Sequence, residues 1–349
     1  MKYRHEHHAG NFADVHKHVT LLALLAALKR KDKGFLYLET HAGRGAYELS
    51  GAAAESANGI GRLELQRSAA GAEPAAAEEI GHYAARVAQL RTERRQPRLY
   101  PGSPLLAVSE LRPQDRAVFV EVLPAEARAL ERALSGQAQG RGGAFQRSTA
   151  SLRRAGVHGG TPRACAKQDS VAQCDRPPQV AGSRAKTTLF ARDGAGPGRS
   201  PDPALHITVE SGDGFERMRA WLPPQERRGL TFIDPPYEES RQDFDRARHA
   251  AAEALRRFQT GVVAIWYPIK DERDTSAWHA ALAAELDCGL LAAELALYPR
   301  DSRVALNGSG MLILNPPYQL AERMETWLPQ LHRCLDLGHG GGTSVRHLA

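Results

Sequence analysis

The segment Asp234-Pro235-Pro236-Tyr237 carries residue types suited to chemistry on a planar amino group. It follows the apolar run Gly229–Ile233, which predicts a buried strand. Each proline fixes φ and lacks an N–H donor, so the loop is stiff and its carbonyl groups remain as acceptors. The Asp234 carboxylate and the Pro235 carbonyl can accept the two N–H bonds of an exocyclic amine, while Tyr237 stacks on the ring that carries it. An ordinary turn with an acidic cap would show the same four residues.

A glycine pair follows the first predicted strand. The strand Gly34–Glu39 runs directly into a turn that holds Gly43 and Gly45. A strand, a G-x-G turn and a helix bring backbone close to a nucleotide-like ligand, because glycine permits turns that other side chains block. The third glycine of the dinucleotide fingerprint is missing, which disfavours a nicotinamide oxidoreductase. Taken alone, the pair is equally compatible with a plain tight turn.

Two further acids lie at the ends of predicted strands. Glu121 lies near the end of 117–122, and Asp213 follows 206–210 in a glycine-rich turn. An acid after the second strand of a doubly wound fold commonly bonds ribose hydroxyls, and Asp213 could accept from an adenine amino group. Parallel sheets bind ligands at the carboxyl ends of their strands, so Gly43, Glu121, Asp213 and Asp234 are expected on one rim. Their order along the chain, more than any single residue, favours a nucleoside pocket.

The loop pattern occurs a second time, as Asn315-Pro316-Pro317-Tyr318. This copy follows the last strand predicted before the closing helix. Ligands of α/β sheets bind at the central strand ends, so Asp234 is preferred as the functional residue. Asn315 is interpreted as a turn former whose prolines end the strand.

Alternating strands and helices predict an α/β fold in consecutive segments. The stretch 46–98 is rich in alanine and glutamate and predicts a helical insertion, whereas 137–203 has few apolar residues and predicts a disordered insertion. The expected segments are an N-terminal arm, first helix, first strand and G-x-G turn (1–45), the helical insertion (46–98), core (99–136), the disordered insertion (137–203), core with the catalytic loop (204–337) and a mobile tail (338–349).

Composition narrows the class of protein. The 349 residues carry a net charge of +6, which mildly favours a polyanionic partner. The four cysteines show no CxxC spacing, and no apolar segment predicts a signal peptide or a membrane span. These features predict a soluble cytoplasmic protein, expected to be a monomer.

The N-terminal arm is basic, aromatic and rich in donors, and it includes Tyr3, Arg4 and Lys17. Five histidines lie within its first eighteen residues, but they lack the paired spacing of a helical zinc site. Contact with phosphate or with a ligand is therefore preferred over metal binding.

The chain resembles class I S-adenosylmethionine-dependent methyltransferases, and most closely the RlmJ family of 23S ribosomal RNA adenine-N6 methyltransferases. The resemblance covers nearly all of the chain outside 137–203. It is carried by Tyr3-Arg4-His5, His8-Ala9-Gly10-Asn11, Ala13-Asp14-Val15, Lys17-His18, Phe35-Leu36-Tyr37-Leu38, Thr40-His41-Ala42-Gly43, Tyr100-Pro101-Gly102-Ser103-Pro104, Asp213-Gly214-Phe215, Arg227-Arg228-Gly229-Leu230, Ile233-Asp234-Pro235-Pro236-Tyr237, Trp266-Tyr267-Pro268 and Ser309-Gly310-Met311.

The resemblance implies a Rossmann-like sheet with helices on both faces and methylation of N6 of adenine 2030 in 23S ribosomal RNA. It implies that Asp234 is the catalytic acceptor, and that Tyr3, with Arg4 and Lys17, meets the RNA. The S-adenosylmethionine site would be lined by Gly43 and Asp234 together with His18, His41, Ser103, Glu121, Asp213 and Gly214. Two departures stand out: the family does not usually carry the segment 137–203, and its Glu-Leu-His-Pro is Glu121-Val122-Leu123-Pro124 here.

Three alternatives remain open. A DNA adenine-N6 methyltransferase would usually add a base-reading module, and none is visible in the sequence. A protein-glutamine methyltransferase would use a similar loop, usually with asparagine in the place of Asp234. A catalytically silent RNA-binding protein of the same fold would be expected to lack Asp234 or the Gly43 turn, and both are present.

Overall fold

The computed structural model describes residues 9–49, 54–69, 77–140, 144–147, 205–238, 240–299, 302, 304 and 306–348. The chain divides into two units, Met1–Thr149 with Asp202–Ala349 and Ala150–Pro201. The second unit lies outside the described residues, as does most of the insertion predicted at 137–203. The predicted boundary at 137 is wrong, because α6 (Pro124–Gly140) continues past it and β5 (Ala144–Arg147) joins the sheet.

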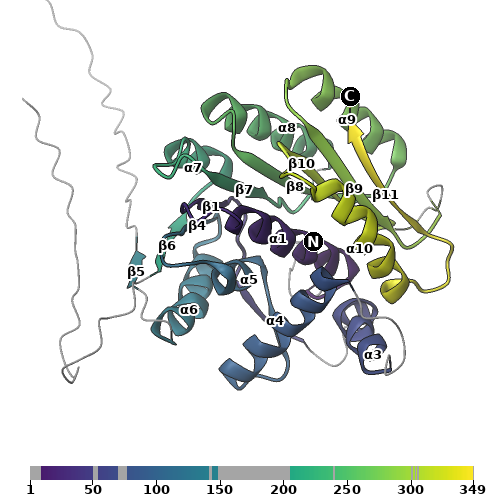
Figure 1. Ribbon diagram of the computed structural model, residues 1–349, viewed down its shortest axis with the longest axis horizontal. Coiled ribbons are helices and arrows are strands. Elements are labelled where there is room, and N and C mark those ends of the chain that lie inside the picture. Colours follow the sequence, from purple (N-terminus) through teal and green to yellow (C-terminus); the bar gives the residue numbers. More distant parts are fainter. Residues whose placement is uncertain are drawn as a thin grey trace, which may run out of the picture. The chain divides into compact units, whose positions relative to one another are not determined.

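One mixed sheet runs through the first unit (Figure 1). Its strands, in spatial order, are β11 (Gly342–Leu348), β9 (Leu290–Ala296), β10 (Gly308–Leu314), β8 (Val262–Ile269), β7 (Gly229–Ile233), β1 (Leu36–Glu39), β4 (Arg116–Glu121), β6 (His206–Ser211) and β5. The strands from β8 to β5 are mutually parallel, whereas β10 is antiparallel to both of its neighbours. Since β8 and β9 each oppose β10, they point the same way. The predicted α/β class is confirmed.

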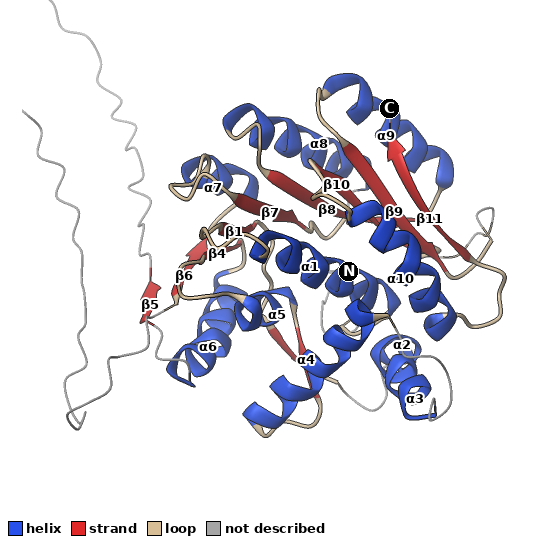
Figure 2. Cartoon of the chain, viewed as in Figure 1, coloured by secondary structure: helices blue, strands red, loops and turns tan. Residues whose placement is uncertain are grey.

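Helices cover both faces of the sheet (Figure 2). The central strands are apolar runs because both of their faces are buried. Side chains alternate between the faces, so that Tyr37 packs in one hydrophobic cluster while Leu36 and Leu38 pack in the other. The first cluster includes residues of α1 (Phe12–Lys29), α5 (Ser103–Glu110), α6 and α10 (Leu320–Leu335), and the second includes residues of α7 (Gly214–Trp221), α8 (Ser240–Arg257) and α9 (Glu272–Glu285).

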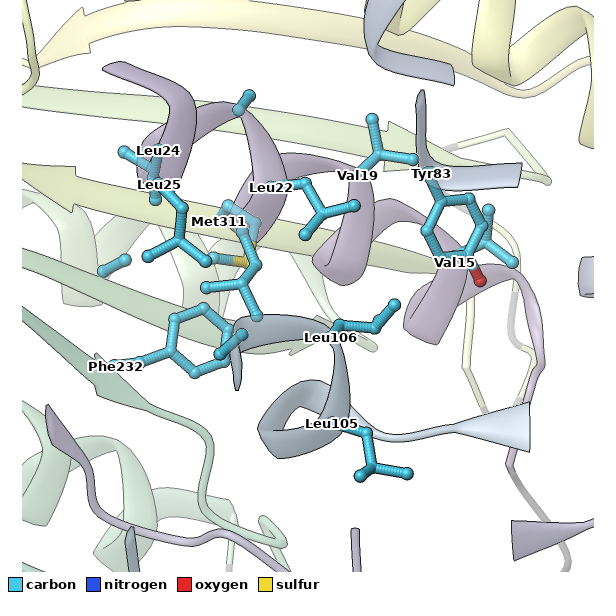
Figure 3. Packing of buried hydrophobic residues seen from close by; sticks show 14 of the residues in the cluster. Val15, Val19, Leu22, Leu24, Leu25, Tyr83, Leu105, Leu106, Phe232 and Met311 are labelled. Atoms are coloured by element: carbon cyan, nitrogen blue, oxygen red, sulfur yellow. The ribbon is translucent and has the colours of Figure 1, made fainter. Parts of the chain in front are cut away.

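Helix α1 is buried along most of its length. The sequence predicted a helix from His16, but α1 begins four residues earlier because the Asn11 side chain caps it by accepting from the Asp14 N–H at 2.9 Å. Figure 3 shows its core contacts, in which Val15, Val19, Leu22, Leu24 and Leu25 lie among Tyr83, Leu105, Leu106, Phe232 and Met311. This packing fixes the side chains that the first turns of α1 carry.

The helical insertion predicted between β1 and β4 is present. It contains α2 (Ala54–Ser56), the π-helix η2 (Ala57–Gly61), α3 (Arg62–Ala69) and α4 (Glu78–Arg94). A short antiparallel ladder of β2 (Ala46–Glu48) and β3 (Leu99–Pro101) brings its two ends together. Within the described ranges, none of the helices combines the length and the apolar character that crossing a bilayer requires.

The predicted mobile tail is wrong for 342–348. These residues form β11, which pairs antiparallel with β9 from Gly342 opposite Ala296 to Leu348 opposite Leu290. Arg346 also donates to the buried Glu294 at 2.8 Å. An edge strand is held chiefly through its backbone, so its sequence need not show the apolar alternation that identifies a half-buried strand.

Candidate active site

The sheet has a topological switch point between β1 and β7. The chain leaves β1 for β4 and β6 on one side and returns to β7 on the other. The loops that follow β1 and β7 diverge at such a point and leave a crevice at the carboxyl edge of the sheet. His41, Gly43 and the segment Asp234–Tyr237 line a cavity of about 480 Å³ there, within the usual range of about 300–1,000 Å³ for ligand sites.

The cavity extends along the carboxyl edge from β1 to β9. On the β1 side its wall includes Gly102 and Ser103, which open α5. Beyond the Asp234 loop the wall continues with residues in the second half of β8 or after β8 and β9, including Trp266, Pro268, Lys270, Leu297 and Tyr298. The first turns of α1 contribute residues near the centre of this row, including Asn11, Asp14, Lys17 and His18.

Lys17 joins α1 to the Asp234 loop. Its Nζ lies 2.7 Å from Asp234 Oδ2, 2.8 Å from Asp14 Oδ1 and 5.4 Å from the centre of the Trp266 ring. Burial favours the neutral amine, but Asp14 and Asp234 outweigh burial and raise the pKa of Lys17 well above its usual range. Lys17 donates to Oδ2 only, and no hydrogen bond from the described residues reaches Asp234 Oδ1. One carboxylate oxygen of Asp234 is therefore fixed and the other is available to a ligand.

Tyr237 is held in an aromatic cluster under the loop. Its hydroxyl donates to the Trp266 carbonyl at 2.8 Å, its φ is 51°, and its ring centre lies 4.8 Å from that of Phe244. The side chain lines the cavity, yet the residue is only 2% exposed. Stacking of Tyr237 on a substrate ring remains a prediction. Trp266 is a more exposed aromatic wall of the same cavity.

Buried polar groups fix the Trp266 indole. Its Nε1–H donates to Ser309 Oγ at 3.0 Å, and His16 Nδ1 lies 2.9 Å from the same oxygen. Burial lowers the pKa of His16 to about 3, so the ring is neutral. Ser309 can accept from both rings if its own hydroxyl donates to the Ala13 carbonyl, 3.5 Å away. In that orientation the His16 proton lies on Nδ1, whereas a Ser309 hydroxyl that donates to His16 would place it on Nε2.

Glu121 anchors the glycine turn instead of lining the cavity. Its Oε2 accepts from the Gly43 N–H and its Oε1 from the Leu123 N–H, each at 2.8 Å. Gly43 has a φ of +60°, and a Cβ there would lie 2.6 Å from Tyr47 Oη. The carboxylate thus holds a turn that requires glycine. Both carboxylate oxygens of Glu121 thus accept from backbone N–H groups, and the predicted hydrogen bond from Glu121 to a ribose stays a prediction.

Asp213 and Gly214 also lie outside the cavity wall. Asp213 caps α7 by accepting from the Phe215 and Glu216 N–H groups, and Arg246 donates to its Oδ2 at 2.8 Å. A Cβ at Gly214 would lie 1.8 Å from the Thr40 carbonyl oxygen, so glycine is needed for α7 to approach the end of β1. The described structure therefore gives both residues structural roles, and their predicted contact with the cofactor remains untested.

Five of the predicted cofactor residues do line the cavity, namely His18, His41, Gly43, Ser103 and Asp234. His18 Nδ1 lies 2.9 Å from the Tyr100 hydroxyl, and burial lowers the pKa of His18 to about 3. Of the predicted RNA contacts, Tyr3 and Arg4 lie outside the described residues. Lys17 is described, and it lies at the Asp234 carboxylate.

The sequence reasoning overlooked Glu39, a fully buried acid at the end of β1. Tyr37 Oη donates to its Oε2 at 2.9 Å, and Ser103 Oγ donates to its Oε1. Burial raises the pKa of Glu39 to about 8, so the carboxyl group keeps its proton at neutral pH. The sequence did contain a pattern that could have identified Glu39, because Glu39, like Glu121, is an acid at the end of an apolar strand. Through Ser103, Glu39 supports the β1 side of the cavity.

Asn315 lies at the opposite edge of the sheet. It follows β10, which ends with Leu314 beside Val263 at the start of β8. Its Nδ2 donates to the carbonyls of Gln259 and Gly261 at 2.8 and 2.9 Å, as expected of a turn former.

Among the described residues, no group of three or more histidine, cysteine, aspartate or glutamate side chains is placed to hold a metal ion.

Comparison with known proteins agrees with this architecture. The model of the family described as "Ribosomal RNA large subunit methyltransferase D, RlmJ" matches residues 32–157 and 201–348. Proteins named ribosomal RNA large subunit methyltransferase J from Haemophilus influenzae and Escherichia coli are each 32% identical to this chain. The alignments cover 96% of the chain and 94% of the first relative, and 98% of the chain and 97% of the second.

A crystal structure of a Legionella pneumophila protein resembles the fold with a TM-score of 0.69 and 27% identity, over 98% of this chain and 99% of that one. The switch-point cavity, the Asp-Pro-Pro-Tyr loop and the extent of these matches lead to one assignment. The chain belongs to the RlmJ family of large-subunit ribosomal RNA methyltransferases.

Proposed function

We propose that this protein transfers a methyl group from S-adenosylmethionine to N6 of an adenine in 23S ribosomal RNA, with adenine 2030 as the position that the family resemblance implies. The observation that carries the proposal is the placement of Asp234. Its free Oδ1 and the Pro235 carbonyl belong to a loop that shares one cavity with the Gly43 turn. The loop proposed to accept the amino group and the turn proposed to approach the cofactor therefore lie side by side at the switch point.

The β1 side of the cavity fits S-adenosylmethionine. His18, His41 and Ser103 offer polar atoms for its amino acid and ribose groups, and the Gly43 turn presents backbone without a side chain. The Asp234 carboxylate and the Trp266 ring suit a neighbouring positive charge. When bound, the cofactor supplies an electrophilic methyl group on a sulfonium.

Asp234 would orient the accepting nitrogen. The lone pair of an adenine amino group is delocalised into the ring, so the nitrogen is a weak nucleophile. Asp234 Oδ1 and the Pro235 carbonyl would accept its two N–H bonds, localise the lone pair and align it with the methyl group. Lys17 keeps Oδ2 in place at 2.7 Å, which limits rotation of the carboxylate. Asp234 can receive the proton that the nitrogen releases and pass it to solvent.

The target base must leave its stack to reach this loop. Trp266 lies on the far side of Asp234 from the Gly43 turn, where an extruded adenine would enter. Its indole is held by Ser309 at 3.0 Å, so the wall that meets the base is rigid. Tyr237 also stabilises this wall, because its hydroxyl donates a hydrogen bond to the Trp266 carbonyl.

The test is methyl transfer from labelled S-adenosylmethionine to protein-free, unmodified 23S ribosomal RNA, with the product nucleoside identified. We expect N6-methyladenosine from the unaltered protein and a loss of at least about 100-fold in Asp234→Ala, the scale on which a single positioned polar group acts. Asn315→Ala is the matched control and should keep its activity, because Asn315 lies at the other edge of the sheet. Equal activity in Asp234→Ala would refute the assignment of the loop. Transfer to DNA but not RNA would favour the DNA methyltransferase alternative, and RNA binding without transfer would favour the catalytically silent RNA-binding protein.

A further inference from the structure

We propose that the β9 end of the cavity, where Tyr298 lines the wall and stacks on His339, binds the nucleotide next to the target adenine, with Lys270 of the same cavity contacting its phosphate. This proposal rests on the function proposed above, because it assumes that the target is extruded from an RNA strand. It adds a second base-binding position, to which the segment after β9 contributes Tyr298 and the turn between α10 and β11 contributes His339.

The position of this end along the sheet is the first argument. The cavity runs past the ends of β1, β7, β8 and β9, and the Asp234 loop lies after β7. A cofactor at the Gly43 turn and a target base at Asp234 would not occupy the part of the cavity that follows β9. Its wall is mainly apolar and includes Leu297, Val304, Leu306 and Leu337. An extruded nucleotide stays bonded to its neighbours, so at least one neighbour must pass the cavity mouth.

Tyr298 and His339 form a stacked pair at this end. Their ring centres lie 4.6 Å apart and their planes differ by only 8°. Tyr298 lines the cavity, while His339 is exposed, so the pair joins the cavity wall to the surface. Nucleic-acid bases stack on tyrosine and histidine rings whatever their sequence, because every base has a π face. A flanking base would extend this stack by one ring.

Glycines shape the turn that presents His339. Gly338 and Gly340, on either side of it, have φ values of +79° and +78°, which other residues rarely adopt. A Cβ at Gly341 would lie 2.1 Å from the Ala296 carbonyl oxygen, so this residue must also be small. The Gly338 N–H donates to Asp336 Oδ1 at 2.9 Å, and β11 fixes the far side of the turn on β9. The backbone thus holds His339 against Tyr298.

Lys270 supplies a positive charge to the same wall. It follows β8, is exposed and lines the cavity. Lys17, the other lysine of the wall, is already paired with Asp14 and Asp234. Lys270 forms no ion pair with any described carboxylate, so its ammonium can contact the phosphate between the target and the flanking nucleotide. A stacked aromatic pair and an available cation at one cavity suit a nucleotide better than they suit an apolar peptide.

The experiment uses a short RNA that the unaltered protein methylates, prepared intact and with the base on either side of the target adenine removed. The variants are Tyr298→Leu, which fills the space without a π face, Tyr298→Phe, which keeps the face, and His339→Ala. Tyr318→Leu is the matched control, because Tyr318 is 82% exposed and outside the cavity wall. Thermal unfolding of each variant checks that it is folded.

We expect Tyr298→Leu and His339→Ala to lower kcat/KM on intact RNA by roughly 10-fold or more, the scale of one lost stacking contact. Tyr298→Phe, which keeps the π face, should retain most of the activity that Tyr298→Leu loses, and Tyr318→Leu should match the unaltered protein. On one of the two abasic RNAs, Tyr298→Leu should cause little further loss, because the base that it contacts is already gone. Lys270→Met should weaken the dependence of RNA binding on salt concentration by about one phosphate contact.

Two results would overturn the subsite while leaving the proposed function intact. One is full activity of folded Tyr298→Leu and His339→Ala on intact RNA. The other is an equal loss on intact and on both abasic RNAs, which would mean that Tyr298 acts only by packing. Failure of the unaltered protein to methylate any RNA would instead refute the proposed function, and the subsite with it.

Discussion

The molecule contains the same short pattern twice, and the two copies lie at opposite edges of one sheet. Asp234 follows the parallel strand β7 and is paired with Lys17, and Tyr237, in the same loop, is 2% exposed. Asn315 follows the antiparallel strand β10 and donates to two backbone carbonyls, while Tyr318 in that loop is 82% exposed. Similar tetrapeptides therefore have different surroundings because their strands run in opposite directions.

The comparison shows that strand direction decides what such a loop can do. At the Asp234 edge the loop meets the glycine turn after β1 and the first turns of α1, which together close a cavity. At the Asn315 edge the side chain instead closes the turn before β8. A motif acquires chemistry only where the topology supplies the rest of a site.

After the loss of Asp234 itself, the largest difference should come from removing Lys17, the cation that pairs with it. We expect Lys17→Met to lower kcat/KM by about 10- to 100-fold, since small misplacements of a catalytic group have effects of this size. Lys29→Met is the control, because Lys29 belongs to the same helix but pairs with Glu110, outside the cavity wall. Labelled methyl transfer by both variants measures the contrast. Equal rates would show that the ion pair with Asp234 has no part in catalysis.

The Asp234 edge should also respond to pH through Glu39. Burial raises the pKa of Glu39 in the folded protein to about 8. The protonated group therefore contributes its full stability at pH values below the pKa of Glu39 in the unfolded chain, and this stability is lost as the pH rises through 8. Glu39→Gln, which resembles the protonated acid, should remove this dependence. Between pH 6 and 8 the variant should gain about 2 kcal/mol relative to the unaltered protein. Urea unfolding at several pH values would detect it, and parallel pH curves for the two proteins would contradict a buried, protonated Glu39.

A substitution at Asn315 should lower the stability of the protein without lowering the rate of methyl transfer. Asn315→Asp removes two donated hydrogen bonds and places a carboxylate against the carbonyls of Gln259 and Gly261. We expect a loss of about 1–3 kcal/mol in the free energy of unfolding. The rate of methyl transfer per folded molecule should stay within about twofold of the unaltered protein. A twofold change corresponds to only a few tenths of a kcal/mol in the activation free energy. A clear drop in the activity of the folded variant would argue that both loops act on the substrate.

The smallest contrast concerns the two tyrosines. Tyr237→Phe removes the hydroxyl that donates to the Trp266 carbonyl at 2.8 Å, which should lower stability by about 1 kcal/mol and activity a few-fold. Tyr318→Phe should leave both unchanged, because the Tyr318 side chain is exposed. Thermal unfolding and initial rates of the two variants, measured side by side, are sufficient. Identical behaviour would mean that the bond to Trp266 contributes nothing measurable.

The central strands were predictable because each is a short apolar run bounded by turns. The parallel order then placed Gly43 and Asp234 at one edge, as the structure shows. The sequence could not reveal that the carboxylates of Glu121 and Asp213 are engaged by backbone amides, because that depends on the path of the following loop. It also could not reveal the direction of β10 or the pairing of β11. Both are set by neighbouring strands and not by their own residues.

The ion pair between Lys17 and Asp234 joins residues that are 217 positions apart in the chain. During synthesis from the N-terminus, Lys17 and Asp14 are made long before Asp234, so the growing chain carries the first part of the site without its acceptor. A fragment that stops before β7 would contain the glycine turn and α1, yet it would lack Asp234, the residue proposed to orient the substrate amine. The site proposed for catalysis is thus completed late in chain growth, once β7 and the Asp234 loop that pairs with Lys17 have been made.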